Sequence, residues 1–186
     1  MFLKQITAPT IEPISLTEAK LHLKVSVSTD DDLITRLIKA AREFCEEYTG
    51  RSFISTEWQL YMDTFPRVIH LDKTPIIELG WVKYYPDEAN PELTELSAIN
   101  YTSDIIGEPG RIMCADGYVW PDVRVALNSV IVNYTSGYGT AASDVPAMIK
   151  EAMLLHIGHN YDNRGDEGHR KYPRDIYDLL DKVRTF

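Results

Sequence analysis

The sequence predicts an α+β fold, mainly an α-helical bundle of N- and C-terminal helices with an inserted antiparallel β lobe. Apolar residues recur at helical spacing near both ends of the chain, and turn residues separate alternating apolar and polar stretches in the middle. We therefore expect a single domain over residues 1–186. Within it, we expect N-terminal helices in 1–52, the β lobe in 53–140 and C-terminal helices in 141–186.

The N-terminal region predicts two helices. The first begins at Ser15-Leu16-Thr17-Glu18, a capping box in which the serine and glutamate side chains each accept a hydrogen bond from a free backbone N–H. The second begins at Asp30-Asp31-Asp32, where carboxylates favour the positive end of the helix dipole, and Gly50 ends it. Its apolar stripe is Leu33, Leu37, Ala41, Phe44 and Tyr48, widened by Ile34, Ile38 and Cys45.

The middle of the chain changes to a period of two, which is typical of half-buried strands. Gly107-Glu108-Pro109-Gly110 indicates a turn, as does Ser136-Gly137-Tyr138-Gly139. Short strands separated by turns favour an antiparallel sheet over parallel units with helical crossovers. The inward-facing strand residues are expected to be Trp58, Leu60 and Met62, then Ile77, Leu79 and Trp81, then Val130, Val132 and Tyr134.

Helical spacing returns after Asp144-Val145-Pro146, a cap followed by a proline suited to the first turn. This third helix is expected to run to about Tyr161, and residues 162–172 form a charged loop. A short last helix over 175–183 follows. Its apolar residues are Ile176, Leu179, Leu180 and Val183.

Charge is unevenly distributed along the chain, whose formal net charge is −9. Residues 61–144 carry 5 basic and 12 acidic groups, a net charge of −7, so they should repel phosphate and disfavour tight, general DNA binding. No apolar run is long enough to span a bilayer, and the N-terminus lacks the apolar core of a signal peptide. We therefore expect no membrane association and a protein that stays in the cytoplasm where it is made.

No motif in the sequence indicates an enzyme. Phosphate-binding glycine loops and the GxSxG nucleophile motif are absent, and Cys45 and Cys114 form no CxxC pair. His156 and His159 could share a helix face as a metal pair, but no third ligand accompanies them. We expect no catalytic residues, no metal and no cofactor, with a metal-dependent hydrolase kept as an alternative.

Basic residues gather in and beside the loop between the last two helices. Arg164, His169, Arg170, Lys171 and Arg174 are interrupted there by acidic residues. This segment is either a solvated loop or a docking segment for an acidic protein surface or DNA, so a nucleic-acid-binding module using residues 164–174 is the second alternative. Arginine and tyrosine are enriched at interface hot spots. The expected assembly interface comprises Tyr161, Arg164, Arg170, Lys171, Tyr172, Arg174, Leu179, Leu180 and Arg184.

Three groups of motifs, in this order, resemble the head–tail connector (adaptor) family of long-tailed bacteriophages. The first group is PISLTEAKLHLKV at 13–25, with DDDLI at 30–34 and the helix end YTGR at 48–51. The second is VIVNYTSGYG at 130–139, followed by Val145-Pro146 and a helix ending in HNY. The third is Leu179-Leu180 with Arg184.

The resemblance implies a structural subunit of a ring, twelvefold to match the portal, in the virion neck. It implies contacts with the portal and with a tail-side completion or tail protein, and DNA that passes through the channel without tight binding. The subunit would be made in the host bacterial cytoplasm and would complete the head and retain its DNA. The family pattern after Leu-Leu has an apolar residue, proline and an aromatic before arginine, whereas this chain has Asp181-Lys182-Val183-Arg184, so no specific C-terminal contact is carried over.

Overall fold

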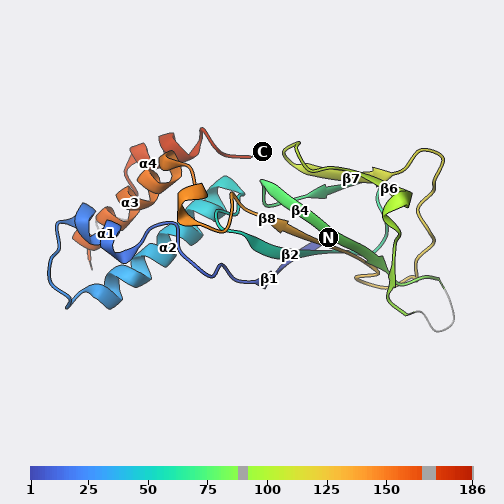
Figure 1. The fold of residues 1–186 in the computed structure, drawn as a ribbon, viewed down its shortest axis with the longest axis horizontal. Coiled ribbons are helices and arrows are strands. Elements are labelled where there is room, and N and C mark those ends of the chain that lie inside the picture. Colours follow the sequence, from blue (N-terminus) through green and yellow to red (C-terminus); the bar gives the residue numbers. More distant parts are fainter. Residues whose placement is uncertain (88–91, 165–170, 186) are drawn as a thin grey trace. The chain divides into compact units, whose positions relative to one another are not determined.

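The computed structural model describes residues 1–87, 92–164 and 171–185, and the chain divides into two compact units (Figure 1). The β unit consists of Met1–Pro9 and Ser55–Gly137. The helical unit consists of Thr10–Ile54 and Tyr138–Phe186. Helices near both ends of the chain and antiparallel sheets between them confirm the predicted α+β class.

Two antiparallel sheets form the β unit. The five-stranded sheet has the order β1-β2-β8-β4-β5, and the three-stranded sheet has the order β3-β7-β6. The strands are β1 (Phe2–Thr7), β2 (Thr56–Met62), β3 (Val68–Leu71), β4 (Ile76–Tyr84), β5 (Thr94–Glu95), β6 (Tyr101–Asp104), β7 (Gly110–Cys114) and β8 (Val130–Ser136), and a 3-10 turn, η1 (Ala98–Asn100), precedes β6.

Strand β8 is the centre of the larger sheet. It pairs with β2 on one side, where Val132 lies opposite Leu60, and with β4 on the other, where Val132 lies opposite Val82. Every residue of β8 except Thr135 is buried, so the predicted alternation of buried and exposed positions is lost there. A strand covered on both faces buries large side chains such as that of Tyr134. The Tyr134 hydroxyl donates a hydrogen bond to the backbone carbonyl of Asp72.

The N-terminal segment belongs to this β unit. Residues 1–52 were expected to form the N-terminal helices, whereas Phe2–Thr7 forms an edge strand whose Leu3 lies opposite Leu60 of β2. Most of its side chains are exposed. An edge strand with little buried surface gives no apolar alternation, which is why its sequence did not indicate a strand.

Four helices form the other unit: α1 (Leu16–Leu23), α2 (Asp31–Thr49), α3 (Ala147–Asp162) and α4 (Arg174–Leu180), with a 3-10 turn, η2 (Ala142–Asp144), before α3. The predicted capping box is present at α1, where Glu18 N donates to Ser15 Oγ at 3.1 Å and Ser15 N donates to Glu18 Oε2 at 2.8 Å. Gly50 follows α2 with φ of 72°, a left-handed conformation that favours glycine. None of the described helices is long and apolar enough to cross a membrane.

The core of the helical unit lies between α2, α3 and α4. Its fully buried α2 residues are those that widen the predicted stripe, Ile34, Ile38 and Cys45, together with Ala41. Leu37, Phe44 and Tyr48 are only half-buried and pack around this core. The buried face of α2 is therefore shifted around the helix axis, by about one residue position, from the apolar stripe that the sequence predicted.

Helix α4 is part of that core. Ile176 and Leu180 are both fully buried against the other helices. Leu180, which was expected in the assembly interface, therefore lies in the core of its own unit. A seven-residue helix has too little local stability to form alone, so its apolar face packs on its own bundle.

Candidate assembly surfaces

Tyr161 and Arg164, two of the expected interface residues, form a cluster with Asp30 at the start of α2. The Tyr161 hydroxyl donates to Asp30 Oδ2 at 2.5 Å, and this hydrogen bond raises the pKa of Tyr161. The Arg164 guanidinium lies 4.3 Å from the centre of the Tyr161 ring, and its Nη1 lies 3.8 Å from Asp30 Oδ2. The cluster joins the end of α3 to the start of α2, so these two side chains already have partners within their own unit.

Tyr172 lies in an aromatic cluster rather than on an open surface. Its ring centre is 4.8 Å from that of Phe44, 4.6 Å from that of His156 and 5.4 Å from that of His159. The four rings join α2 and α3 to the segment that precedes α4. Tyr172 therefore orients this segment on the bundle.

The remaining expected interface residues differ in exposure. Lys171, Arg174 and Arg184 are exposed, and the Arg174 side chain keeps 90% of its accessible surface. Among the described residues, the exposed Arg174 pairs with Asp178, four residues further along the chain, at 3.6 Å. Leu179 is half-buried, and Leu180 is fully buried and exposes no surface in this structure. Arg170 lies outside the described residues, as does His169.

His156, the first residue of the histidine pair, has the surroundings of a core residue, whereas His159 is half-buried. His156 is buried against Phe44 at 4.7 Å between ring centres, and Asn160 Nδ2 lies 3.2 Å from its Nδ1. Among the residues that the structure describes, no group of three or more His, Cys, Asp or Glu side chains could hold a metal ion. Burial raises the pKa of the Cys45 thiol to about 12, which disfavours the reactive thiolate.

A buried ion network that the sequence analysis missed fixes the start of the helical unit. Arg42 Nε donates to Glu12 Oε2 at 2.7 Å, and its Nη1 donates to Glu46 Oε2 at 2.7 Å. The second carboxylate oxygen of Glu46 accepts from the backbone N–H of Phe53 at 2.7 Å. The only sequence signal was the spacing of four residues between Arg42 and Glu46. Arg42, Glu12 and Glu46 all have partners within the helical unit, so this ion network stabilises the fold and is not a binding site.

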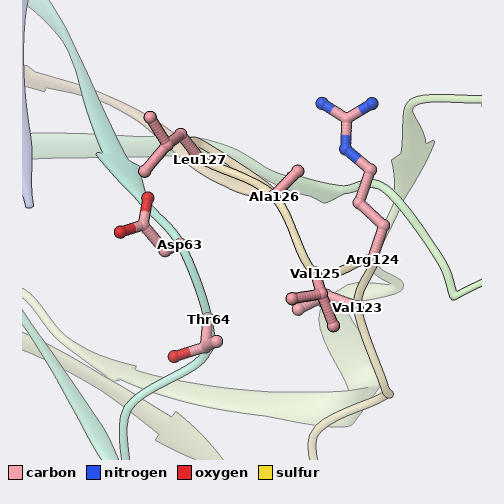
Figure 2. A pocket seen from close by; sticks show the side chains of 7 residues that line it. All are labelled: Asp63, Thr64, Val123, Arg124, Val125, Ala126 and Leu127. Atoms are coloured by element: carbon pink, nitrogen blue, oxygen red, sulfur yellow. The ribbon is translucent and has the colours of Figure 1, made fainter.

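An exposed apolar loop on the β unit was also missed. Residues 123–127, together with Asp63 and Thr64, line an open pocket of about 380 Å³ (Figure 2). Val125 is fully exposed and Leu127 is 76% exposed. Exposed apolar surface of this kind marks interaction sites. The alternating sequence Val-Arg-Val-Ala-Leu is typical of a strand, but most of these residues form no regular strand.

One family model matches part of the chain. Residues 13–88 match the family model described as phage gp6-like head-tail connector protein. This match covers all of α1 and α2 and strands β2 to β4, and it confirms the resemblance to head–tail connectors that the sequence motifs predicted. No curated protein sequence matches the chain.

Solved structures with the same fold come from gene transfer agent (GTA) particles. A chain from the virion of a native GTA particle has a TM-score of 0.82 at 19% identity, and one from the neck of an empty GTA particle, computed with C6 symmetry, has 0.81 at 18%. A chain from the neck of a native GTA particle, computed with C12 symmetry, has 0.78 at 21%. Each match covers 100% of this chain and 96% of the other.

Proposed function

We propose that this chain is a structural subunit of the virion neck, where copies of it form a ring between the portal and the tail. The observation that carries this proposal is the full-length likeness to chains from GTA particles, two of them in necks computed with C6 and C12 symmetry. The family match over residues 13–88 supports the same class of protein. A twelvefold ring would match the portal, and its completion would close the head and retain the packaged DNA.

The distribution of charge suits a subunit that touches DNA only in passing. The β unit carries six basic and twelve acidic residues, a net charge of −6. Negatively charged surfaces bind phosphate weakly, so DNA could slide past them without being held. The exposed cations Lys171 and Arg174 are instead suited to an acidic protein partner, for which we propose the portal.

Neither alternative function has comparable support. The nucleic-acid-binding module depended on a cluster whose Arg170 lies outside the described residues and whose Arg164 is paired within the chain. The hydrolase depended on His156 and His159, of which the first is packed between aromatic rings.

Mixing the purified chain with its cognate portal protein tests the proposal. We expect electron microscopy to show an added ring on one face of the portal, and mass measurement to give its copy number. The same preparation should bind DNA weakly at physiological salt. A portal that stays bare at high concentrations of the chain would refute the connector role, and strong salt-dependent DNA binding would favour the nucleic-acid module.

A further inference from the structure

The five-stranded sheet of the β unit has two open edges. Figure 1 shows β1 and β4 with β2 and β8 between them, and β1 pairs with β2 alone among the described strands. On the other side, the two residues of β5 pair with Lys83 and Tyr84 of β4, and Leu96 N donates to the Val82 carbonyl. Residues 76–81 of β4 therefore pair only with β8 in the part of the chain that the structure describes. Unpaired backbone N–H and C=O groups along an edge accept an added strand.

The two open edges have the same length and similar apolar content. Strand β1 has six residues, and residues 76–81 of β4 match this length. Phe2 of β1 is 62% exposed, and Ile77 of β4 is 42% exposed. Leu3 and Leu79 are half-buried at the two margins of the core that this sheet covers. Pairing the two edges would therefore bury apolar surface as well as satisfy the backbone.

Strand direction favours a second copy of the chain as the source of the added strand. The pairings of β1 with β2, of β2 with β8 and of β8 with β4 are all antiparallel, so β1 and β4 run in opposite directions. A neighbouring copy that continues the sheet after a small rotation would place its β1 antiparallel to β4, which is the commoner way for strands to pair. The contact joins two different edges, so it is head-to-tail, and such contacts close into rings when the rotation allows it.

Lys4 and Glu78 lie on the same face of this sheet. Lys4 of β1 is opposite Gln59 of β2. Two residues away on β2, Glu57 is opposite Thr135 of β8, which is opposite Glu78 of β4. Residues directly opposite one another, or two apart on one strand, share a face of the sheet. Lys4 and Glu78 are both exposed, and within the described residues neither has an ion pair or a hydrogen bond, so each edge offers one charge and the two charges are opposite in sign.

One register satisfies both faces of the sheet. With Lys4 opposite Glu78 of the next copy, Leu3 lies opposite Leu79, because the two strands run antiparallel. Leu3 and Leu79 pack against the same apolar core within one subunit, so this register extends that core across the contact. A lysine on an open edge opposes pairing with an arbitrary strand, whereas a strand that carries glutamate at the opposite position accepts it.

We propose that β1 of one subunit adds to the open edge of β4 in the next subunit of the ring, with Lys4 opposite Glu78. This contact rests on the proposed connector function and makes a second copy of the chain the partner of both edges. The five-stranded sheets then form a β belt around the ring. A twofold dimer through β1 alone would instead bring two Lys4 side chains together on one face, which like-charge repulsion disfavours.

Disulfide trapping of rings assembled on the portal tests this contact. In a Cys114→Ser background, Lys4→Cys combined with Glu78→Cys should give a ladder of covalent multimers on mild oxidation, because opposite residues of an antiparallel pair are close enough for a disulfide. The matched control combines Lys4→Cys with Met113→Cys, which places the second thiol on an exposed residue of the three-stranded sheet.

The outcomes separate this contact from the connector function. Intact rings that give only monomers, or the same ladder in both pairs, would overturn the contact while leaving the connector function in place. Covalent dimers from Lys4→Cys alone would show that β1 pairs with β1, which also overturns the contact. Wild-type chain that forms no ring would overturn both the contact and the connector function.

Charge reversal gives an independent test. Lys4→Glu and Glu78→Lys should each raise the concentration needed for half-maximal ring assembly by about tenfold, because each places like charges opposite one another. The double variant should restore assembly to within about threefold of the wild type, since the pair is then reversed. Both residues are exposed, so the single variants should keep the wild-type melting temperature. A double variant that assembles no better than the worse single variant would show that the two residues do not meet and would overturn the contact.

Discussion

The imidazole of His156 stacks on the ring of Phe44, with 4.7 Å between the ring centres and 26° between the planes. This contact joins α3 to α2 at the aromatic cluster that also holds Tyr172. Burial lowers the pKa of His156 to about 4, and the nearby His159 adds to this effect. The folded protein therefore keeps His156 neutral at pH values where an exposed histidine would be protonated.

Acid should consequently destabilise the helical unit through His156. As the pH falls from about 6.5 to about 4, the unfolded chain binds a proton that the folded chain does not, so the free energy of unfolding falls by up to roughly 3 kcal/mol. Urea unfolding followed by circular dichroism at several pH values in this window would measure the loss. His156→Phe keeps an aromatic stack and should show a smaller dependence on pH. If the free energy of unfolding fell equally with pH in the wild type and in the variant, the pKa of His156 would not be lowered in the folded state.

The Arg42 network should contribute strongly to stability. Arg42→Ala would leave the carboxylates of Glu12 and Glu46 without their cation, and we expect a loss of about 2–4 kcal/mol because both are partly buried. Arg36→Ala, on an exposed position of the same helix, is the matched control and should change the free energy of unfolding by less than about 0.5 kcal/mol. Denaturant unfolding compares the two. A similar loss in the free energy of unfolding for both variants would mean that the ion network contributes no stability beyond the helix propensity of arginine.

Local signals predicted the helices well. The capping box at Ser15, the glycine at 50 and the proline at 146 each lie at the expected end of a helix. Such signals act over a few residues, so one sequence is enough to detect them. The order of connector motifs then indicated the family, because the spacing of caps and turns is a property of the fold.

Long-range structure was harder to predict. Strand β1 pairs with β2 across more than 50 residues and buries little, so nothing near Phe2–Thr7 indicates a strand. The three-stranded sheet was missed because its strands are short and the turn at 107–110 was interpreted alone. The assembly residues were chosen by type, and residue type does not reveal burial: Leu180 lies in the core, whereas the exposed Val125 and Leu127 were not considered.

Leu180 should therefore affect folding rather than assembly. Leu180→Ala removes a fully buried side chain and should lower the free energy of unfolding by about 2–5 kcal/mol. Leu179→Ala, one residue earlier and half-buried, should cost clearly less. For the same reason, deleting residues 173–186 should unfold the helical unit, since it also removes Ile176. A truncated chain that keeps its cooperative thermal transition would show that α4 is dispensable for the core.

The exposed cations beside α4 should affect assembly rather than folding. Lys171→Glu with Arg174→Glu changes two solvated side chains, so the melting temperature should stay within about 2 °C of the wild type. If they meet an acidic portal surface, the reversal should weaken ring formation on the portal by tenfold or more, at about 0.1 M salt. Arg36→Glu with Lys39→Glu is a control of equal charge change on the exposed face of α2. Microscopy and sedimentation of portal mixtures give the readout, and equal losses in the two double variants would show that only net charge matters.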